Sequence, residues 1–247
     1  MTPTLHTTVS NTHQLTWGII KMIEVTYIDH MGSDLSVVNA ARVSFGKKSE
    51  ALGTSGVEGE PMTPILNDPD KRLIKYLAKH KHMSPFGHAF ASFHIKAPIF
   101  VARQLVKHKF LRWNEVSRRY VDDKPEFYEP DEWRGRADDK KQGSSDSAAV
   151  FMENGQVISS VATSHKLRSL TLYQNMIHAG VCPEQARMVL PQSTMTEWYW
   201  SGSLDAFMDM CNLRCKLDTQ YETRLVAEYI LSEMINLFPV SVESLRR

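Results

Sequence analysis

Alternation of apolar and polar residues is clearest between residues 88 and 96, where Phe93 faces one side and His94 the other. A period of two residues is typical of a strand with one buried face. The β-branched segment Lys21–Asp29 predicts another strand, and the aromatic segment Trp198–Trp200 predicts a shorter third one.

Apolar residues recur at helical spacing in much of the remaining chain. We expect one helix to begin at Asp34, a second at Asp68 that stops at Ser84-Pro85, and a third at Pro98. The C-terminal third predicts helices near 158–180, 183–190, 203–214 and 218–237. Because strands and helices do not alternate regularly, the pattern favours an α+β fold over a doubly wound parallel sheet.

Two segments interrupt these patterns. Residues 46–64 contain four glycines and two prolines, which predicts a loop. Residues 134–147 (RGRADDKKQGSSDS) are charged and contain Gly and Ser, which predicts a disordered surface insertion. The polar start of the chain predicts a mobile extension over 1–20. One folded domain should therefore cover 21–247, with loop insertions near 46–66 and 134–156.

Composition is that of an ordinary globular protein, with 42% hydrophobic residues, 23% charged residues and a net charge of +1. This balance predicts neither nucleic acid nor a membrane surface as a partner. The cysteines are Cys182, Cys211 and Cys215, a sparse and odd set that argues against a disulfide framework and favours the cytoplasm. We expect no metal site, no transmembrane span and no signal peptide.

Residues able to bind anions are concentrated in one segment. Its cationic members are Arg103, Lys107, His108, Lys109, Arg112, Arg118 and Arg119. On the helix opened by Pro98, Arg103 and Lys107 are four residues apart and share one face. Gln104 and His108 then share the adjoining face.

Several donors follow, around the carboxylate of Glu115. They are Asn114, Ser117, Arg119 and Tyr120. Because phosphates are bound by guanidinium, ammonium and hydroxyl groups, the segment could hold two negatively charged ligands. The alternative is a solvated basic helix face. Ser117 has no base at an obvious spacing, so phosphate binding is favoured over a nucleophilic role. The chain lacks G-x-G-x-x-G, G-x-x-x-x-G-K-[ST], H-E-x-x-H and G-x-S-x-G motifs.

The spacing of Lys107-His108-Lys109, seven further residues and Ser117 resembles the Arg-His-Arg, seven residues, Ser signature of flavin-dependent thymidylate synthases. Further blocks resemble that family in the same order: AARVSFGK (40–47), YLAKHKHMSPFGHAFASFHIKAPIFVARQ (76–104), NEVSRRY (114–120), ARMVLP (186–191) and CNLR (211–214). Together they cover roughly residues 22 to 225. Both arginines of the triplet are lysines here, which keep the charge but lose the planar guanidinium.

The resemblance implies a single domain with a mixed or antiparallel sheet flanked by helices, in a homotetramer with active sites at subunit junctions. FAD and dUMP would stack on each other in each site. The positions that match FAD contacts are Ser44, His82, Ser84, Lys107, His108, Lys109, Glu115, Ser203 and Asp209. The positions that match dUMP contacts are Gln104, Lys107, Glu115, Ser117, Arg118, Arg119, Arg187 and Arg214. Arg214 matches the catalytic residue that activates dUMP by favouring negative charge on the uracil ring.

The implied reaction is the reductive methylation of dUMP to dTMP, in which NADPH reduces FAD and 5,10-methylenetetrahydrofolate supplies the carbon. Two other interpretations stay open. One is a flavoprotein that oxidises NADPH and methylates nothing. The other is a nucleic-acid-binding module that uses residues 103–119 as a basic helix, with salt-dependent affinity.

Overall fold

The computed structural model describes residues 22–56, 62–120, 123–137 and 144–247. The strands are β1 (Glu24–Met31), β2 (Gly53–Ser55), β3 (Thr63–Ile65), β4 (Phe90–Pro98), β5 (Arg112–Glu115), β6 (Arg134–Arg136), β7 (Ser144–Ala148) and β8 (Met195–Ser203). The α-helices are α1 (Asp34–Arg42), α2 (Asp68–Lys79), α3 (Ile99–Leu105), α4 (Ile158–His178), α5 (Pro183–Ala186), α6 (Leu204–Arg214), α7 (Tyr221–Leu237) and α8 (Pro239–Leu245). Short 3-10 helices are η1 (Val43–Phe45), η2 (Ser84–His88) and η3 (Arg187–Val189). The expected mobile extension lies outside the described residues.

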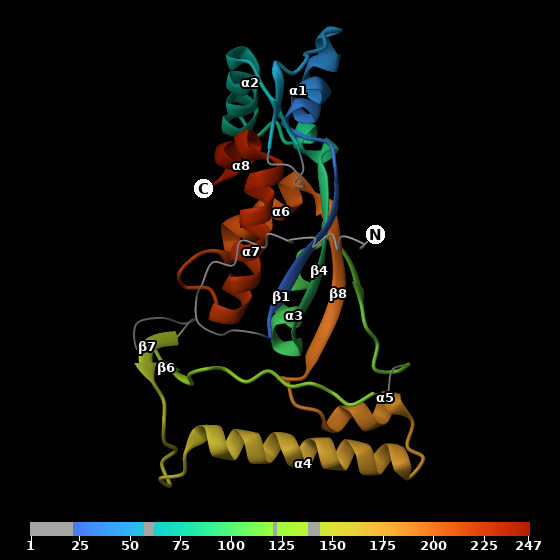
Figure 1. Cartoon of the computed structure of the whole chain (residues 1–247). Coiled ribbons are helices and arrows are strands. Elements are labelled where there is room, and N and C mark those ends of the chain that lie inside the picture. Colours follow the sequence, from blue (N-terminus) through green and yellow to red (C-terminus); the bar gives the residue numbers. More distant parts are fainter. Residues whose placement is uncertain (1–21, 57–61, 121–122, 138–143) are drawn as a thin grey trace, which may run out of the picture.

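A four-stranded antiparallel sheet with the strand order β1-β4-β8-β5 forms the centre of the molecule (Figure 1). In β4, Phe93 is buried and His94 is partly exposed, as the alternation predicts. Phe93 pairs with Tyr27 of β1 and with Trp200 of β8. Trp200 pairs in turn with Trp113 of β5. Aromatic side chains of four strands therefore meet on one face of the sheet.

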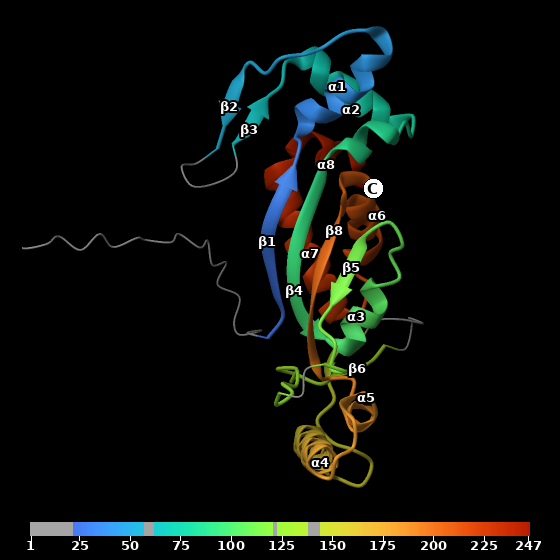
Figure 2. The same ribbon diagram turned by 90° about the vertical axis from the view of Figure 1, so that its right-hand side faces the viewer.

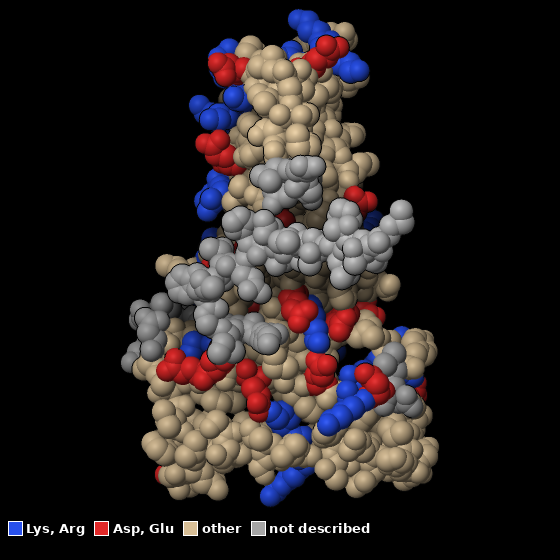
Figure 3. All heavy atoms as spheres, viewed as in Figure 1, with Lys and Arg blue, Asp and Glu red and all other residues tan. Residues whose placement is uncertain are grey.

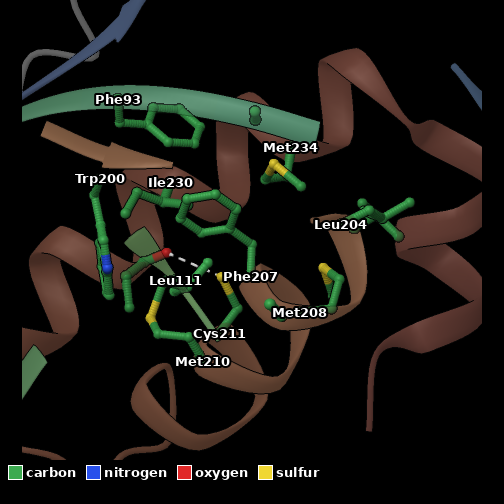
Figure 4. Packing of buried hydrophobic residues seen from close by; sticks show 14 of the residues in the cluster. Phe93, Leu111, Trp200, Leu204, Phe207, Met208, Met210, Cys211, Ile230 and Met234 are labelled. Atoms are coloured by element: carbon green, nitrogen blue, oxygen red, sulfur yellow. Dashed lines mark hydrogen bonds between the residues drawn. The ribbon is translucent and has the colours of Figure 1, made fainter. Parts of the chain in front are cut away.

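Helices α6 and α7 cover this face (Figures 1 and 2). Phe207 of α6 lies edge-on to both Phe93 and Trp200, with ring centroids 5.2 Å and 5.7 Å away. Ile230 and Met234 of α7 complete the cluster, and all five side chains are fully buried (Figure 4). Each such side chain contributes roughly 1.5–3 kcal/mol by leaving water. The expected α+β fold with an antiparallel sheet flanked by helices is confirmed, and it forms a single domain.

The two ends of the molecule are built by different helices. At one end α1, α2 and α8 pack together, and at the other α4 and α5 lie across the end of the sheet (Figures 1 and 2). The Asp34 carboxylate ties the first end together, because it accepts the backbone N–H groups of Val240 and Ser241 at 2.8 and 3.0 Å. None of the helices in the described ranges is long and apolar enough to cross a membrane.

Several predicted boundaries are wrong. The N-cap of α2 is Asn67 rather than Asp68, since the Asn67 side chain accepts the backbone N–H of Asp70 at 2.8 Å. The helix ends at Lys79, and Lys81 then takes a positive φ of 57° that no helix can continue. The predicted strand over 21–29 runs later, at Glu24–Met31. The predicted loop over 46–64 contains the antiparallel pair β2 and β3.

The prediction of a disordered insertion over 134–147 is also wrong for the residues of that range that the structure describes. Strands β6 and β7 pair antiparallel there, and residues 138–143 lie outside the described ranges. The Arg134 guanidinium donates to the buried Glu222 carboxylate at 2.6 Å. This ion pair fixes the segment against α7, which composition alone does not reveal.

The C-terminal predictions are close to the observed elements. The helices near 158–180, 203–214 and 218–237 are confirmed as α4, α6 and α7. The predicted helix over 183–190 is instead the short α5 followed by η3. The predicted aromatic strand is the centre of the longer β8, and α8 had no predicted counterpart.

Candidate functional site

The contact between Arg214 and His108 joins two segments that the sequence places 106 residues apart. Arg214 is the last residue of α6, and His108 lies in the turn after α3. The Arg214 Nε donates a hydrogen bond to His108 Nε2 at 3.2 Å. The imidazole also lies edge-on to the buried Trp200, with ring centroids 6.3 Å apart. The two residues are therefore fixed against the core.

The protonation state of His108 follows from this position. Burial, and then the positive charge of Arg214, lower the pKa of His108 from 6.5 to about 4. The imidazole is therefore neutral at pH 7, as its role as an acceptor requires. Burial also lowers the pKa of Arg214, but an arginine stays charged in proteins. The site thus holds one positive charge supported by a neutral acceptor.

Glu115 is held by two hydrogen bonds at the end of β5. Its Oε1 accepts from Thr196 Oγ1 at 2.8 Å, and its Oε2 accepts from Trp113 Nε1 at 3.1 Å. Trp113 stacks on Trp198, with ring centroids 4.4 Å apart. The carboxylate keeps free lone pairs for a ligand, but its orientation is set by the sheet.

The segment after β5 exposes a small donor cluster. Arg119 Nε donates to Ser117 Oγ at 3.1 Å, and its guanidinium also lies over the Tyr120 ring at 5.1 Å. Arg118 points elsewhere, because its Nη1 forms an ion pair with Asp123 at 3.3 Å. A guanidinium beside a hydroxyl is suited to an anion such as a phosphate. Ser117 and Arg119 therefore come together as expected, whereas the Arg118 guanidinium is already paired with Asp123.

Five of the residues predicted to contact the flavin lie on two adjacent parts of the fold, η1–η2 and α6. Ser44 in η1, His82 before η2 and Ser84 in η2 are exposed. The His82 ring stacks near Tyr76, with centroids 6.1 Å apart. η2 packs against α1 and α6. Helix α6 carries the other two: Ser203 at its N-cap and the exposed Asp209.

Arg187 is separated from these groups. It is exposed in η3, where its Nε donates to the Glu184 carbonyl at 3.2 Å. The preceding α5 lies at the end of the molecule opposite α1, after which η1 carries Ser44 (Figures 1 and 2). A single chain therefore does not bring Arg187 and Ser44 together.

The predicted helix faces in the cationic segment are wrong. Helix α3 ends at Leu105, so Lys107 and His108 do not continue the faces of Arg103 and Gln104. Tertiary contacts of the turn outweigh helix propensity here, since His108 binds Arg214. The basic-helix interpretation of residues 103–119 fails for the same reason, because β5 occupies part of that range. On the face seen in Figure 3, acidic and basic side chains are intermingled over the described surface.

The sequence did not identify three residues that orient the predicted site residues. Trp113, Thr196 and Trp200 orient Glu115 and His108. A signal existed for one of them, because Trp113 lies two residues before Glu115 and so shares its face of a strand. Thr196 and Trp200 carry no such local signal.

Two other features concern possible ligands. Within the described ranges, no group of three His, Cys, Asp or Glu side chains could hold a metal ion. A cavity of about 450 Å³ lies between α4 and β6, lined among others by Tyr128, Trp133 and Lys166. None of the predicted site residues lines it.

Comparisons with known proteins identify the family of the chain. The sequence profile of the family described as thymidylate synthase complementing protein matches residues 26–240. A flavin-dependent thymidylate synthase of Thermosipho africanus is 37% identical over 219 residues, which cover 85% of this chain and 83% of the relative. One of Thermus thermophilus is 38% identical over 206 residues, which cover 83% of this chain and 69% of the relative.

A solved structure extends the likeness to three dimensions. The UMP/dUMP methylase PolB from Streptomyces cacaoi, bound with 5-Br dUMP, matches with a TM-score of 0.72 and 30% identity, covering 90% of this chain and 94% of that chain. Profile, sequence identity and fold therefore agree over most of the molecule. The chain belongs to the thymidylate synthase complementing protein family, the family of the flavin-dependent thymidylate synthases.

Proposed function

We propose that this methyltransferase is a flavin-dependent thymidylate synthase that methylates C5 of dUMP with 5,10-methylenetetrahydrofolate as the carbon donor and NADPH as the reductant. The observation that carries the proposal is the contact of Arg214 with the His108 turn. It joins the CNLR block to the cationic triplet, two motifs of the resemblance that lie far apart in the sequence.

The donors that follow β5 support a nucleoside monophosphate as the substrate. Ser117 and Arg119 already lie within hydrogen-bonding distance of each other and are open to a phosphate. Glu115 offers an oriented carboxylate for the base or the sugar. Gln104 has a buried side-chain oxygen without a partner in the described atoms, which suits a donor from a ligand.

Arg214 would act on the uracil ring. A guanidinium held against the ring favours ionisation at N3 and stabilises the negative charge on the ring, which makes C5 a nucleophile toward the one-carbon unit. The new bond joins C5 to that carbon, both bonds from the carbon to the folate nitrogens N5 and N10 break in turn, and the C5 proton is released. Since the His108 hydrogen bond occupies only Nε, both Nη groups can face the ring.

The residues present fit a flavin dinucleotide. Ser44, Ser84, Lys107 and Lys109 are all exposed donors, which is the chemistry that a pyrophosphate and ribitol chain require. When bound, FAD would carry the electrons of NADPH to the one-carbon unit as a hydride. The lysines supply point charges where the family has arginines, so the phosphate contacts would be single rather than bidentate.

A site made of all these residues would need more than one chain. Arg187 and Ser44 belong to opposite ends of the molecule, as the positions of α5 and α1 in Figures 1 and 2 indicate. This separation supports the proposal of a homotetramer in which active sites lie at subunit junctions. Each site would then take Arg187 from a different subunit than the flavin-binding serines.

Binding of dUMP by variants tests the substrate proposal. Arg119→Gln should weaken dUMP binding about 10- to 100-fold in calorimetry of the FAD-loaded protein, the effect of losing one charge-assisted hydrogen bond. Arg168→Gln, which removes an exposed arginine of α4, is the matched control and should bind normally. Deoxyuridine, which lacks the phosphate, should bind both variants equally. Equal dUMP affinity of the two variants would contradict a phosphate site at Arg119.

The alternatives predict different outcomes. A protein that binds FAD and oxidises NADPH, yet never releases the C5 proton of dUMP, would be the flavoprotein without methylation. A colourless protein that binds DNA or RNA with strong salt dependence would favour a nucleic-acid module.

A further inference from the structure

His108 makes a contact that the resemblance does not imply. By resemblance, the histidine of the cationic triplet contacts the flavin. In the structure its Nε2 also accepts a hydrogen bond from Arg214 Nε at 3.2 Å. We propose that His108 is a positioning residue that sets the orientation of the Arg214 guanidinium toward the uracil ring. The proposal rests on the proposed function, in which Arg214 acts on dUMP.

The geometry explains how one hydrogen bond can orient the whole group. A guanidinium is planar and attached to the side chain through Nε, so a hydrogen bond at Nε–H restricts the directions in which both Nη groups point. Within the described ranges, the bond to His108 is the one side-chain hydrogen bond of Arg214. Without it, rotation of the long side chain would spread the Nη groups over several positions.

His108 is itself held by its backbone and by the core. Its backbone N–H donates to the Leu105 carbonyl at 3.1 Å, and its carbonyl accepts from Leu111 N–H at 3.3 Å. The ring rests against Trp200, which is fully buried. A turn closed on both sides and a core indole thus make His108 a rigid support, which is what a positioning residue requires.

The charges around the imidazole keep it an acceptor. Arg214 is the charged group that acts on it from α6, Trp200 on β8 carries no charge, and the neighbouring Lys107 and Lys109 are exposed. Burial, and then the positive charge of Arg214, disfavour a protonated ring and lower the pKa of His108. The Nδ1–H tautomer is therefore required, with Nε2 free to accept.

Two substitutions separate positioning from flavin binding. His108→Gln keeps a neutral acceptor of similar reach, whereas His108→Leu keeps the volume and removes the acceptor. We expect His108→Leu to lower kcat for tritium release from C5-labelled dUMP by roughly 100-fold, the usual effect of a misplaced catalytic group. The KM for dUMP should change much less. His108→Gln should recover most of the rate, and both variants should keep their FAD.

A nuclear magnetic resonance titration tests the contact without any substrate. The His108 ring should titrate near pH 4 in the unaltered protein. In Arg214→Leu its pKa should rise but stay below the ordinary value of about 6.5, since the positive neighbour is gone while burial, the larger cause, remains. Circular dichroism of each variant confirms that it is folded.

The outcomes decide between the possibilities. Loss of FAD from both His108 variants, or an unchanged kcat in His108→Leu, would overturn the positioning role. A His108 pKa near 6.5 that does not respond to Arg214→Leu would overturn the contact itself. If the unaltered protein released no tritium, the proposed function would fail while the titration would still decide whether Arg214 and His108 are coupled.

Discussion

Replacing Arg134 by methionine should destabilise the fold, because it leaves the Glu222 carboxylate inside the protein without its ionic partner. The Arg134 Nη2 lies 2.6 Å from Glu222 Oε1, and the Glu222 side chain is only 7% exposed. The same guanidinium donates to Ser144 Oγ at 2.9 Å and covers the Tyr221 ring at 4.5 Å. It therefore joins the β6–β7 segment to the start of α7.

The size of the effect follows from these contacts. Removing one partner of a fully buried ion pair costs about 3–5 kcal/mol. Here the Arg134 side chain is 27% exposed, and Tyr128 still donates its hydroxyl to Glu222 at 3.3 Å, so the cost is smaller. The lost cation–π contact adds about 0.5–1 kcal/mol. We expect Arg134→Met to lower the free energy of unfolding by about 3 kcal/mol.

Urea unfolding at pH 7 and fixed protein concentration measures this change, because assembly alters apparent stability. Glu222→Gln is the matched variant, since it removes the charge and keeps the shape. The double variant Arg134→Met with Glu222→Gln should be more stable than Arg134→Met alone, as no unpaired charge remains. The buried-pair reasoning would be refuted if the free energy of unfolding of Arg134→Met lay within about 0.5 kcal/mol of that of the unaltered protein. It would also be refuted if the double variant were no more stable than Arg134→Met alone.

Three further predictions concern other parts of the fold. Asp34→Asn should lower stability by about 1–3 kcal/mol in urea unfolding, because one of two backbone N–H groups at the start of α8 loses its acceptor. Gly202→Ala should cost about 1–3 kcal/mol in the same assay, because the new Cβ would lie 2.4 Å from Leu111 Cδ2 in the core. The pKa of His108 in the folded protein, about 4, lies below its unfolded value near 6.5, so stability present at pH 7 is lost as the pH falls. Allowing for its partial exposure, the loss between pH 7 and pH 5 should be about 1 kcal/mol, and smaller in His108→Gln.

Local patterns predicted the elements whose burial is regular. Strand β4 could be predicted because its side chains alternate between the buried and the more exposed face of one sheet. Helix α6 was readable from apolar spacing and has the predicted bounds within one residue. In both cases the signal lies within about ten consecutive residues, which is the range over which periodicity is visible.

Long-range contacts decided the rest. Strand β5 (RWNE) has no apolar run and becomes a strand because β8 pairs with it. Arg134 looked like part of a disordered segment, yet its partner Glu222 lies 88 residues away. The turn that ends α3 is likewise fixed by Arg214, which is distant in sequence from His108. Pairings of this kind have no signature in a single sequence.

The candidate site divides in the same way. Ser117 and Arg119 were predicted together and are together, because two residues of separation hold them close. The contact of His108 with Arg214 could not be predicted from either motif. The separation of Arg187 from Ser44 was also invisible, although it bears most directly on whether one chain can form the site.

Formation of dTMP from dUMP by the unaltered protein and by Arg214 variants tests the central claim most directly. The FAD-loaded protein should form dTMP only when NADPH and 5,10-methylenetetrahydrofolate are both present. Arg214→Ala should lower kcat about 100- to 1,000-fold while FAD stays bound, as expected for loss of charge stabilisation at the ring. Unchanged dTMP formation in Arg214→Ala would contradict the role of Arg214. NADPH oxidation by the unaltered protein without any dTMP would contradict the proposed synthase.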